Sequence, residues 1–272
     1  MRENTSSVTP CDPLTIAAIG LLVGVLADFI HEGLGHGGAC LLVGGKPTLL
    51  TSMNFEWDDR GLGRSAHRVV AAGGTIANLL AGGVAVVLLR RPPSSAHVHY
   101  FLWLFAAINL YVGTGYFLFS GVSNIGDWAN FIAGLPHVWL WRVLLILIGG
   151  ASYFLCVMMM LAKAAPLTGG VPAVRYPRAN LLMLIPYVAG AALSLTAGAF
   201  NPQAKALILI SGVAASLGGA SGLAWGPQLL RDPHWLASST APAAIPRHWG
   251  WIVVGLLLAV AFVVVIGPGL KM

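Results

Sequence analysis

Residues 14–44 read LTIAAIGLLVGVLADFIHEGLGHGGACLLVG, and this apolar stretch decides the fold class. A transmembrane helix needs about 20 predominantly apolar residues, so the stretch can cross a bilayer with residues to spare. Within it lie two histidines and a glutamate in six residues, His31-Glu32-Gly33-Leu34-Gly35-His36. Ionisable side chains are costly at membrane depth and usually mark functional sites. The stretch therefore predicts a membrane span that carries a functional site.

The rest of the chain is also unusually apolar. Of its 272 residues, 57% are hydrophobic and only 9% are charged, whereas about 25% are charged in a typical soluble domain. Further apolar runs long enough to span a bilayer lie at residues 68–90, 100–121, 138–162, 179–200, 204–226 and 249–268. We therefore predict an all-α polytopic membrane protein with about six or seven transmembrane helices. We expect an integral multi-pass protein, located in the cell (plasma) membrane.

Two segments between the apolar runs have a different character. Residues 48–57 are β-prone, and residues 58–61 carry a turn signal, so a small β-hairpin or an edge strand at the membrane surface is expected there. An ordinary interfacial loop is the alternative for this segment. A short element is expected at residues 123–135, between the third and fourth apolar runs.

Charge and cysteine usage exclude several classes of function. The net charge of +6 comes from Lys and Arg clustered in the loops, as the orientation of membrane helices requires. No basic run alternates with aromatic residues, so we expect no nucleic-acid partner. Cys11, Cys40 and Cys156 are widely spaced and form no C-x-x-C pair, which argues against a disulfide framework and against a thiolate zinc site.

The spacing of the two histidines sets a geometric condition on any shared ion. Zinc hydrolases place their histidines at i and i+4, which lie about 40° apart around an α-helix, but His36 is five residues after His31. That spacing separates two side chains by about 140° on a regular α-helix. A π-type turn returns residue i+5 to nearly the same face, and Gly33 and Gly35 favour a widened or broken turn. We therefore expect such a turn at Gly33–Gly35.

A catalytic zinc has three protein ligands and one open position, so the two histidines need a partner. Asp127 follows a break rich in Gly, Ser and Asn and is the preferred third ligand, although Asp is also a common helix N-cap. Asp28 lies one turn before His31 and is a candidate acceptor that orients an imidazole. Alternatively, His31 and His36 are separate polar residues of a helix bundle, or they pair with other groups without a metal.

Two further residues are candidates for the chemistry itself. Glu32 is the candidate general base, because an ionised carboxylate accepts a proton and can deliver it to a leaving amine. Asn78 lies in an apolar run, where its amide can hold a substrate carbonyl or stabilise an oxyanion. An interhelical hydrogen bond is the common alternative for Asn in lipid.

Taken in order, these motifs resemble the site-2 protease family of intramembrane zinc metalloproteases. His31-Glu32 and His36 are similar to the His-Glu-x-x-His motif of the family, with one residue inserted. Gly74-Thr75-Ile76-Ala77-Asn78 is similar to its Gly-x-x-x-Asn element, and Asn124-Ile125-Gly126-Asp127-Trp128 to a divergent form of its Asp-containing run. The resemblance covers residues 14–135, about half of the chain.

The resemblance implies a function and a division of the chain. It implies Zn²⁺ bound by His31, His36 and Asp127, with Glu32 as base and Asn78 near the substrate. Residues 1–135 would form the metalloprotease-like core, and residues 136–272 would supply helices for scaffolding or partner binding. The implied activity is endopeptidase cleavage of membrane-embedded protein or peptide substrates, which could add to the strand segment at 46–57 by β-augmentation.

Partners and an alternative function complete the expectations. The expected partners are the membrane-embedded substrate and the lipid bilayer, and a homo-oligomer stays open. The residue inserted into the histidine motif leaves one alternative, a non-proteolytic metal-binding membrane protein with a regulatory or transport role.

Overall fold

The computed structural model describes residues 10–92, 94–201, 217–231 and 241–272. Within these residues, six helices are long and apolar enough to cross a membrane. They are Pro13–Leu42, Arg64–Leu88, Ala96–Ser123, Val138–Lys163, Ala173–Ala199 and Trp249–Ile266. The predicted all-α polytopic fold is therefore confirmed. Most of the apolar run predicted at 204–226 lies outside the described residues, and its end belongs to a short helix, α10 (Gly222–Leu229).

The first span consists of three consecutive helical segments. An α-helix, α1 (Pro13–Asp28), is followed by a π-helix, η1 (Phe29–Gly37), and by a short α-helix, α2 (Gly38–Leu42). Asp12 caps the start of α1, where its carboxylate accepts a hydrogen bond from the backbone N–H of Thr15 at 2.9 Å. The Asp cap satisfies a backbone donor that the first turn cannot pair internally.

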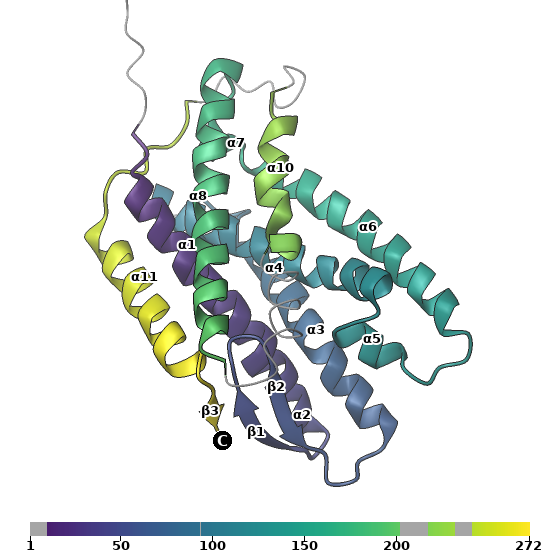
Figure 1. The fold of residues 1–272 in the computed structure, drawn as a ribbon. Coiled ribbons are helices and arrows are strands. Elements are labelled where there is room, and N and C mark those ends of the chain that lie inside the picture. Colours follow the sequence, from purple (N-terminus) through teal and green to yellow (C-terminus); the bar gives the residue numbers. More distant parts are fainter. Residues whose placement is uncertain (1–9, 93, 202–216, 232–240) are drawn as a thin grey trace, which may run out of the picture.

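The other helices pack around this first span (Figure 1). α1 contacts α8 (Pro172–Ala199), α11 (Trp249–Ala261) and α4 (Ala96–Ser123), while η1 packs against α3 (Arg64–Leu88). α6 (Val138–Lys163) lies along α4. The short segments are α7 (Ala165–Thr168), η3 (Gly219–Ser221) and η4 (Phe262–Ile266). Helices from 1–135 and from 136–272 therefore pack into one bundle.

The centre of the bundle is closed by large side chains from α4. Tyr100 and Trp103 are fully buried, and each uses its polar atom on a carbonyl of a neighbouring helix. The Tyr100 hydroxyl donates to Leu182 at 2.8 Å, and the Trp103 indole donates to Met160 at 2.8 Å. Buried aromatic residues with satisfied polar atoms add apolar contact without leaving an unpaired donor.

A small antiparallel sheet lies at one end of the bundle, beside the C-terminus (Figure 1). Its strand order is β2-β1-β3, with β1 (Lys46–Leu50), β2 (Phe55–Asp58) and β3 (Leu270–Lys271). The predicted hairpin is therefore confirmed. Its reversal lies at residues 51–54 and not at the turn signal at 58–61, which follows β2 and leads into α3. The reversal is closed by the backbone bond from Thr51 N–H to the Asn54 carbonyl at 2.9 Å.

The hairpin tip is attached to the end of α8. The Asn201 amide donates to the Thr51 hydroxyl at 3.1 Å. Met53 packs closely against Gly198, where an added Cβ would meet the Met53 sulfur at 2.9 Å and displace that side chain. This contact joins residues about 150 positions apart in the sequence. The tip thereby forms one wall of the interior next to the first span.

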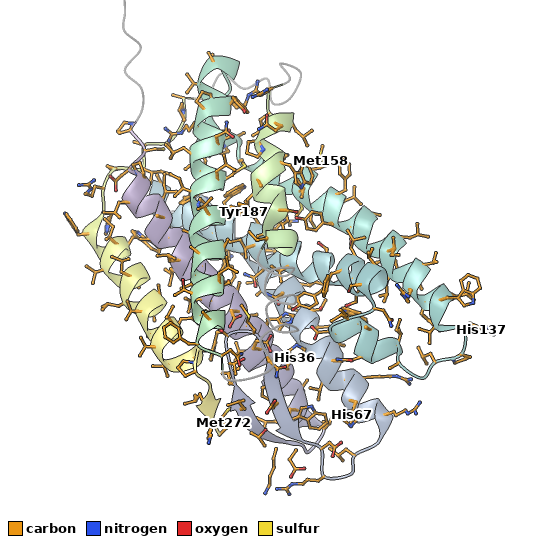
Figure 2. All side chains as sticks on the ribbon, viewed as in Figure 1. His36, His67, His137, Met158, Tyr187 and Met272 are labelled. Atoms are coloured by element: carbon orange, nitrogen blue, oxygen red, sulfur yellow. The ribbon has the colours of Figure 1, made fainter. Side chains whose placement is uncertain are left out.

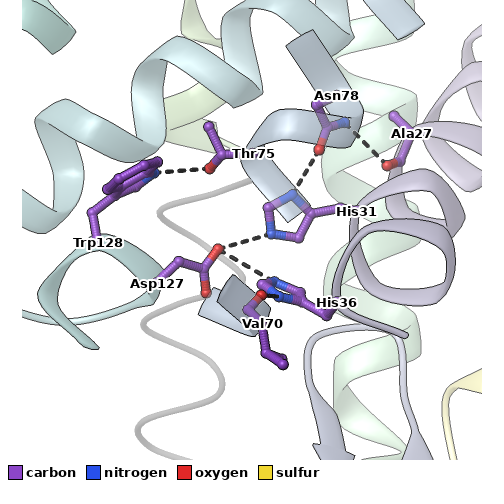
Figure 3. A network of polar contacts seen from close by, with 8 residues as sticks. All are labelled: Ala27, His31, His36, Val70, Thr75, Asn78, Asp127 and Trp128. Atoms are coloured by element: carbon purple, nitrogen blue, oxygen red, sulfur yellow. Dashed lines mark hydrogen bonds and ion pairs between the residues drawn. The ribbon is translucent and has the colours of Figure 1, made fainter. Parts of the chain in front are cut away.

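The short element predicted at 123–135 is α5 (Asp127–Ile132). Between α4 and α5 the chain turns sharply, with φ of 58° at Asn124 and 86° at Gly126. Asn tolerates this left-handed conformation better than most residues, and Gly adopts it without steric cost. The turn directs the first residue of α5, Asp127, back toward the first span (Figure 3).

Candidate metal centre

The π-helix brings the two histidines together. The imidazole centroids of His31 and His36 lie 4.8 Å apart, with their planes 82° from parallel. Both side chains are buried, at 5% and 6% exposure. The expected π-type turn is confirmed as the nine-residue segment η1. Its i→i+5 geometry places side chains five residues apart on one face, which a regular α-helix would not do.

Asp127 completes a three-residue group around one point (Figure 3). Its Oδ2 atom lies 3.1 Å from Nε2 of His31 and 3.4 Å from Nε2 of His36. Zinc–ligand distances of about 2.0–2.2 Å in a tetrahedral site place neighbouring donor atoms about 3.4 Å apart. The Asp127 oxygen is therefore spaced from each imidazole nitrogen as two ligands of one tetrahedral metal ion are.

The position of Asp127 is secured from α3. The Trp128 indole donates to the Thr75 hydroxyl at 3.0 Å, and Arg68 donates to the Phe131 carbonyl at 2.9 Å. The N-cap of α5 is Gly126, and no side chain caps that helix end. The carboxylate of Asp127 is therefore not occupied by capping and is available to the imidazoles.

A chain of amide groups sets the orientation of His31. The Asn109 amide donates to the carbonyl of Phe105 at 2.9 Å, so its Oδ1 atom must face Asn78. Asn78 in turn donates to Asn109 Oδ1 at 2.8 Å and to the Ala27 carbonyl at 3.3 Å. Its Oδ1 atom is left to accept the Nδ1–H of His31 at 2.6 Å. The proton is thus assigned to Nδ1, and the Nε2 lone pair is directed at Asp127.

His36 is oriented in the same way by the backbone. Its Nδ1–H donates to the Val70 carbonyl at 2.7 Å, which leaves Nε2 as the atom facing Asp127. A neutral imidazole oriented so presents a lone pair to a carboxylate, and a cation between them relieves the repulsion. Metal-ligating histidines usually have their other ring nitrogen hydrogen-bonded to such an acceptor. The arrangement is therefore suited to a divalent cation.

Glu32 and Asp28 lie near the group but in other positions. The carboxylate of Glu32 is buried within 4.8 Å of imidazole nitrogens of both histidines, and among the described residues no ion pair joins it to either ring. That separation is longer than the spacing of direct ligands and leaves room for a small reactant. In the described structure, Asp28 makes no hydrogen bond to an imidazole, and the orienting acceptors are Asn78 and the Val70 carbonyl.

Asn78 forms hydrogen bonds between helices, which was the alternative to a role in binding substrate. Its Oδ1 accepts from His31, and both amide hydrogens are used, one on Ala27 and one on Asn109. It therefore contacts a ligand residue and has no donor left to offer a substrate in this arrangement.

Two cavities reach the group from different directions. The polar cavity has a volume of about 850 Å³ and is lined by Glu32, His36 and Asp127 together with residues of β2 and the start of α3. The apolar chamber has a volume of about 100 Å³ and lies between α1, α4 and α8. His36 lies in the half of the bundle next to the sheet, with His67 nearer the sheet end, whereas His137 is at the periphery (Figure 2).

The electrostatics of Asp127 favour its ionised form. Burial on its own would raise the pKa of this carboxyl. When the imidazoles are also protonated at Nε2, the charge of His36 and hydrogen bonds from both rings outweigh burial. The pKa of Asp127 is therefore held well below its usual range. An ionised carboxylate is the form that binds a metal.

Three features of the centre were not identified from the sequence. Tyr116 stacks on the His31 ring, with centroids 4.7 Å apart and planes 25° from parallel, and it lines both cavities. Nothing distinguishes it from other aromatic residues in an apolar run. Gly74 belongs to the Gly-x-x-x-Asn element, so the sequence did draw attention to it. The sequence did not indicate that the missing side chain of Gly74 leaves space for the two imidazoles. The Val70 carbonyl has no sequence signal.

Comparisons of the chain with protein families, curated proteins and solved structures find no match to it. What the chain can do is therefore inferred from the geometry of the centre and the chemistry of its donor atoms.

Proposed function

We propose that this chain is an intramembrane zinc endopeptidase of the site-2 type. The observation that carries the proposal is the convergence of the Nε2 atoms of His31 and His36 on one oxygen of Asp127. Two imidazoles and one carboxylate, each in a suitable orientation, form a ligand set known from zinc hydrolases. A second carboxylate, that of Glu32, lies beside this set.

Each residue of the centre has a role in peptide hydrolysis. A zinc ion held by His31, His36 and Asp127 would supply the Lewis acidity that makes a water molecule acidic enough to react near neutral pH. Glu32 accepts the proton of the attacking water and passes it to the departing amine, which requires a base within reach of both. Burial of His31, Glu32 and His36 within the helix bundle strengthens these electrostatic interactions, because the local dielectric constant is lower than in bulk water.

A hydrogen-bond donor is also needed for the negative charge that develops on the scissile carbonyl. Asn78 has both amide hydrogens engaged, so we assign this role to the Tyr116 hydroxyl. Its ring is held on His31 by stacking, and within the described residues its hydroxyl has no hydrogen-bond partner. The expected effect of losing such a donor is about 10²–10³ in kcat.

The polar cavity supports access for water and substrate. At about 850 Å³ it holds many water molecules, and Phe55 and Trp57 of β2 line it. Among the residues that the structure describes, β2 is an outer strand of the sheet, with β1 on one side only. An extended segment of a membrane-embedded protein or peptide can pair with such an edge and lie along the cavity.

Metal analysis and cleavage of a membrane-embedded peptide test the proposal. The purified protein should carry about one zinc per chain. Glu32→Gln should keep the metal and lose cleavage, while His31→Ala should lose both. Asp59→Asn changes an exposed carboxylate outside the centre and should keep both. Full cleavage by Glu32→Gln would remove Glu32 from the mechanism, and a protein without bound metal would overturn the proposal.

A further inference from the structure

We infer that the apolar chamber is a subsite for one aliphatic residue of the substrate, next to the bond that is cleaved. The inference rests on the proposed endopeptidase function. Glu32 and Tyr116 line both the chamber and the polar cavity, so the chamber begins where the reacting carbonyl would lie. A substrate extended along the polar cavity can therefore direct one side chain into it.

The chamber wall is built from small and aliphatic residues. Gly24 and Ala27 come from α1, Ile108 from α4 and Ala191 from α8. A Cβ on Gly24 would meet only Leu193 at 3.7 Å, so this wall is open toward the chamber. An apolar protein cavity of about 150 Å³ accepts a benzene molecule. The chamber, at about 100 Å³, suits a Leu or Val side chain better than an indole.

Polar groups without partners identify the occupant as a peptide. Ser52 is 4% exposed, and within the described residues its hydroxyl has no hydrogen-bond partner. The half-buried Asp28 and Tyr116 also make no hydrogen bond there through the carboxylate and the hydroxyl. All three line the chamber. An unpaired buried polar group is unfavourable, so an occupant that pairs with the Ser52 hydroxyl is favoured, and the same occupant can reach the other two groups.

A peptide residue supplies the missing partners. Its backbone N–H can donate to a carboxyl oxygen of Asp28, and its carbonyl can accept from the hydroxyl of Ser52 or Tyr116. An extended substrate segment needs such partners, because its own helical hydrogen bonds are lost inside the membrane. A lipid acyl chain would fill the apolar wall and leave all three groups unpaired.

The hairpin tip separates the chamber from the polar cavity. Met53 lines both of them, and its position is set by packing on Gly198 and by the bond between Thr51 and Asn201. The chamber wall therefore includes a flexible thioether side chain, which can adjust to aliphatic residues of different shape.

Filling the chamber tests the inference. Ala191→Phe places a ring in it, and Ala192→Phe adds the same ring to the neighbouring, exposed position of α8. The zinc-loaded proteins are given a single-span peptide with Leu or Ala beside the scissile bond. Ala191→Phe should lower the preference for Leu over Ala by about tenfold or more, because one or two methylenes are worth that much in an apolar pocket. Ala192→Phe should leave the preference unchanged.

A second readout does not depend on turnover. The same peptide with photo-leucine beside the scissile bond should label α1 or α8 in the wild type. Ala191→Phe should reduce that labelling about tenfold. Gly24→Val narrows the chamber from α1 and should act in the same direction, which keeps the test available if Ala191→Phe does not fold.

The outcomes separate the subsite from the catalytic proposal. Cleavage with an unchanged Leu preference in both chamber variants would overturn the subsite and leave the endopeptidase standing. Labelling that both variants reduce, in a protein that does not cleave, would support the chamber as a peptide site and overturn the endopeptidase. A lipid that copurifies with the wild type and is displaced by Ala191→Phe, with peptide labelling unchanged, would also overturn the subsite.

Discussion

The backbone of Gly35 in the π-helix lies directly against the backbone of Gly74 in α3. A Cβ on Gly35 would come within 2.6 Å of the Gly74 Cα atom. A Cβ on Gly74 would come within 2.6 Å of Nε2 of both His31 and His36. The two glycines therefore allow the close helix approach that lets both imidazoles converge beside α3.

Gly74→Ala should strongly weaken metal binding. Real side chains do not tolerate a contact of 2.6 Å, so both imidazoles would have to move away from Asp127. We expect zinc affinity to fall by at least about 100-fold, the upper range for perturbing the surroundings of a metal ligand. Isothermal titration with zinc measures this loss.

Gly83→Ala is the matched control on the same helix. A Cβ there meets nothing within 4 Å, and Ala in a helix interior is favoured over Gly by up to about 1 kcal/mol. This variant should bind zinc normally and be no less stable than the wild type. Normal zinc binding by Gly74→Ala would contradict the assigned packing.

Two variants of Asn78 should show whether its amide oxygen, as the acceptor for His31, or the packing of its side chain supports metal binding. Asn78→Leu removes the acceptor for His31 Nδ1–H, and zinc affinity should fall by about 10–100-fold. Asn78→Asp keeps an oxygen at that place and should retain most of the affinity. Equal loss in both variants would show that the packing of the amide, and not its acceptor, matters to His31. Zinc titration of the two proteins makes the comparison.

Thr75→Val should loosen the attachment of α5. The hydroxyl of Thr75 accepts the Trp128 indole N–H at 3.0 Å, and its removal leaves a donor without a partner. We expect a loss of about 1–3 kcal/mol in the free energy of unfolding. Because Arg68 still holds the end of α5, zinc affinity should fall less than in Asn78→Leu. Denaturation and zinc titration in detergent measure both quantities, and an unchanged free energy would contradict this anchoring role.

The ion pair of Asp12 and Arg247 should make stability depend on pH. The Arg247 guanidinium donates to the Asp12 carboxylate at 3.0 Å, and this hydrogen bond lowers the pKa of Asp12 against the opposing effect of burial. A carboxyl whose pKa is lowered by folding stabilises the protein above its unfolded pKa, near about 3.9. That stability is lost as pH falls through the lower, folded pKa.

Asp12→Asn keeps the helix cap and removes the charge. Its thermal midpoint should therefore fall less than that of the wild type between about pH 5 and pH 2. Asp12→Ala also loses the cap, which costs about 1 kcal/mol at every pH. If the thermal midpoints of wild type and Asp12→Asn change with pH in parallel, the ion pair is not the source of the pH dependence of stability.

The local part of the centre could be predicted because it depends on neighbours in sequence. A spacing of five between His31 and His36 with glycines between them required a widened turn, and η1 has it. The hairpin reversal was misplaced because the tip at 51–54 is held by Asn201 and Gly198, far along the chain. The third strand, β3, pairs the C-terminal residues with β1 and carries no sequence signal.

The sequence by itself determined the membrane spans, the π-helical turn and the types of residue at the centre, because hydropathy and side-chain periodicity act over a few residues. The tertiary structure decided what those residues contact. His31 meets Asn78 from 47 residues away and Asp127 from 96 residues away. Such contacts depend on how helices pack, and helix packing is set by the shapes of many side chains at once. For that reason the three-donor group, the full use of the Asn78 amide and the two cavities that meet at Glu32 emerged only with the folded chain.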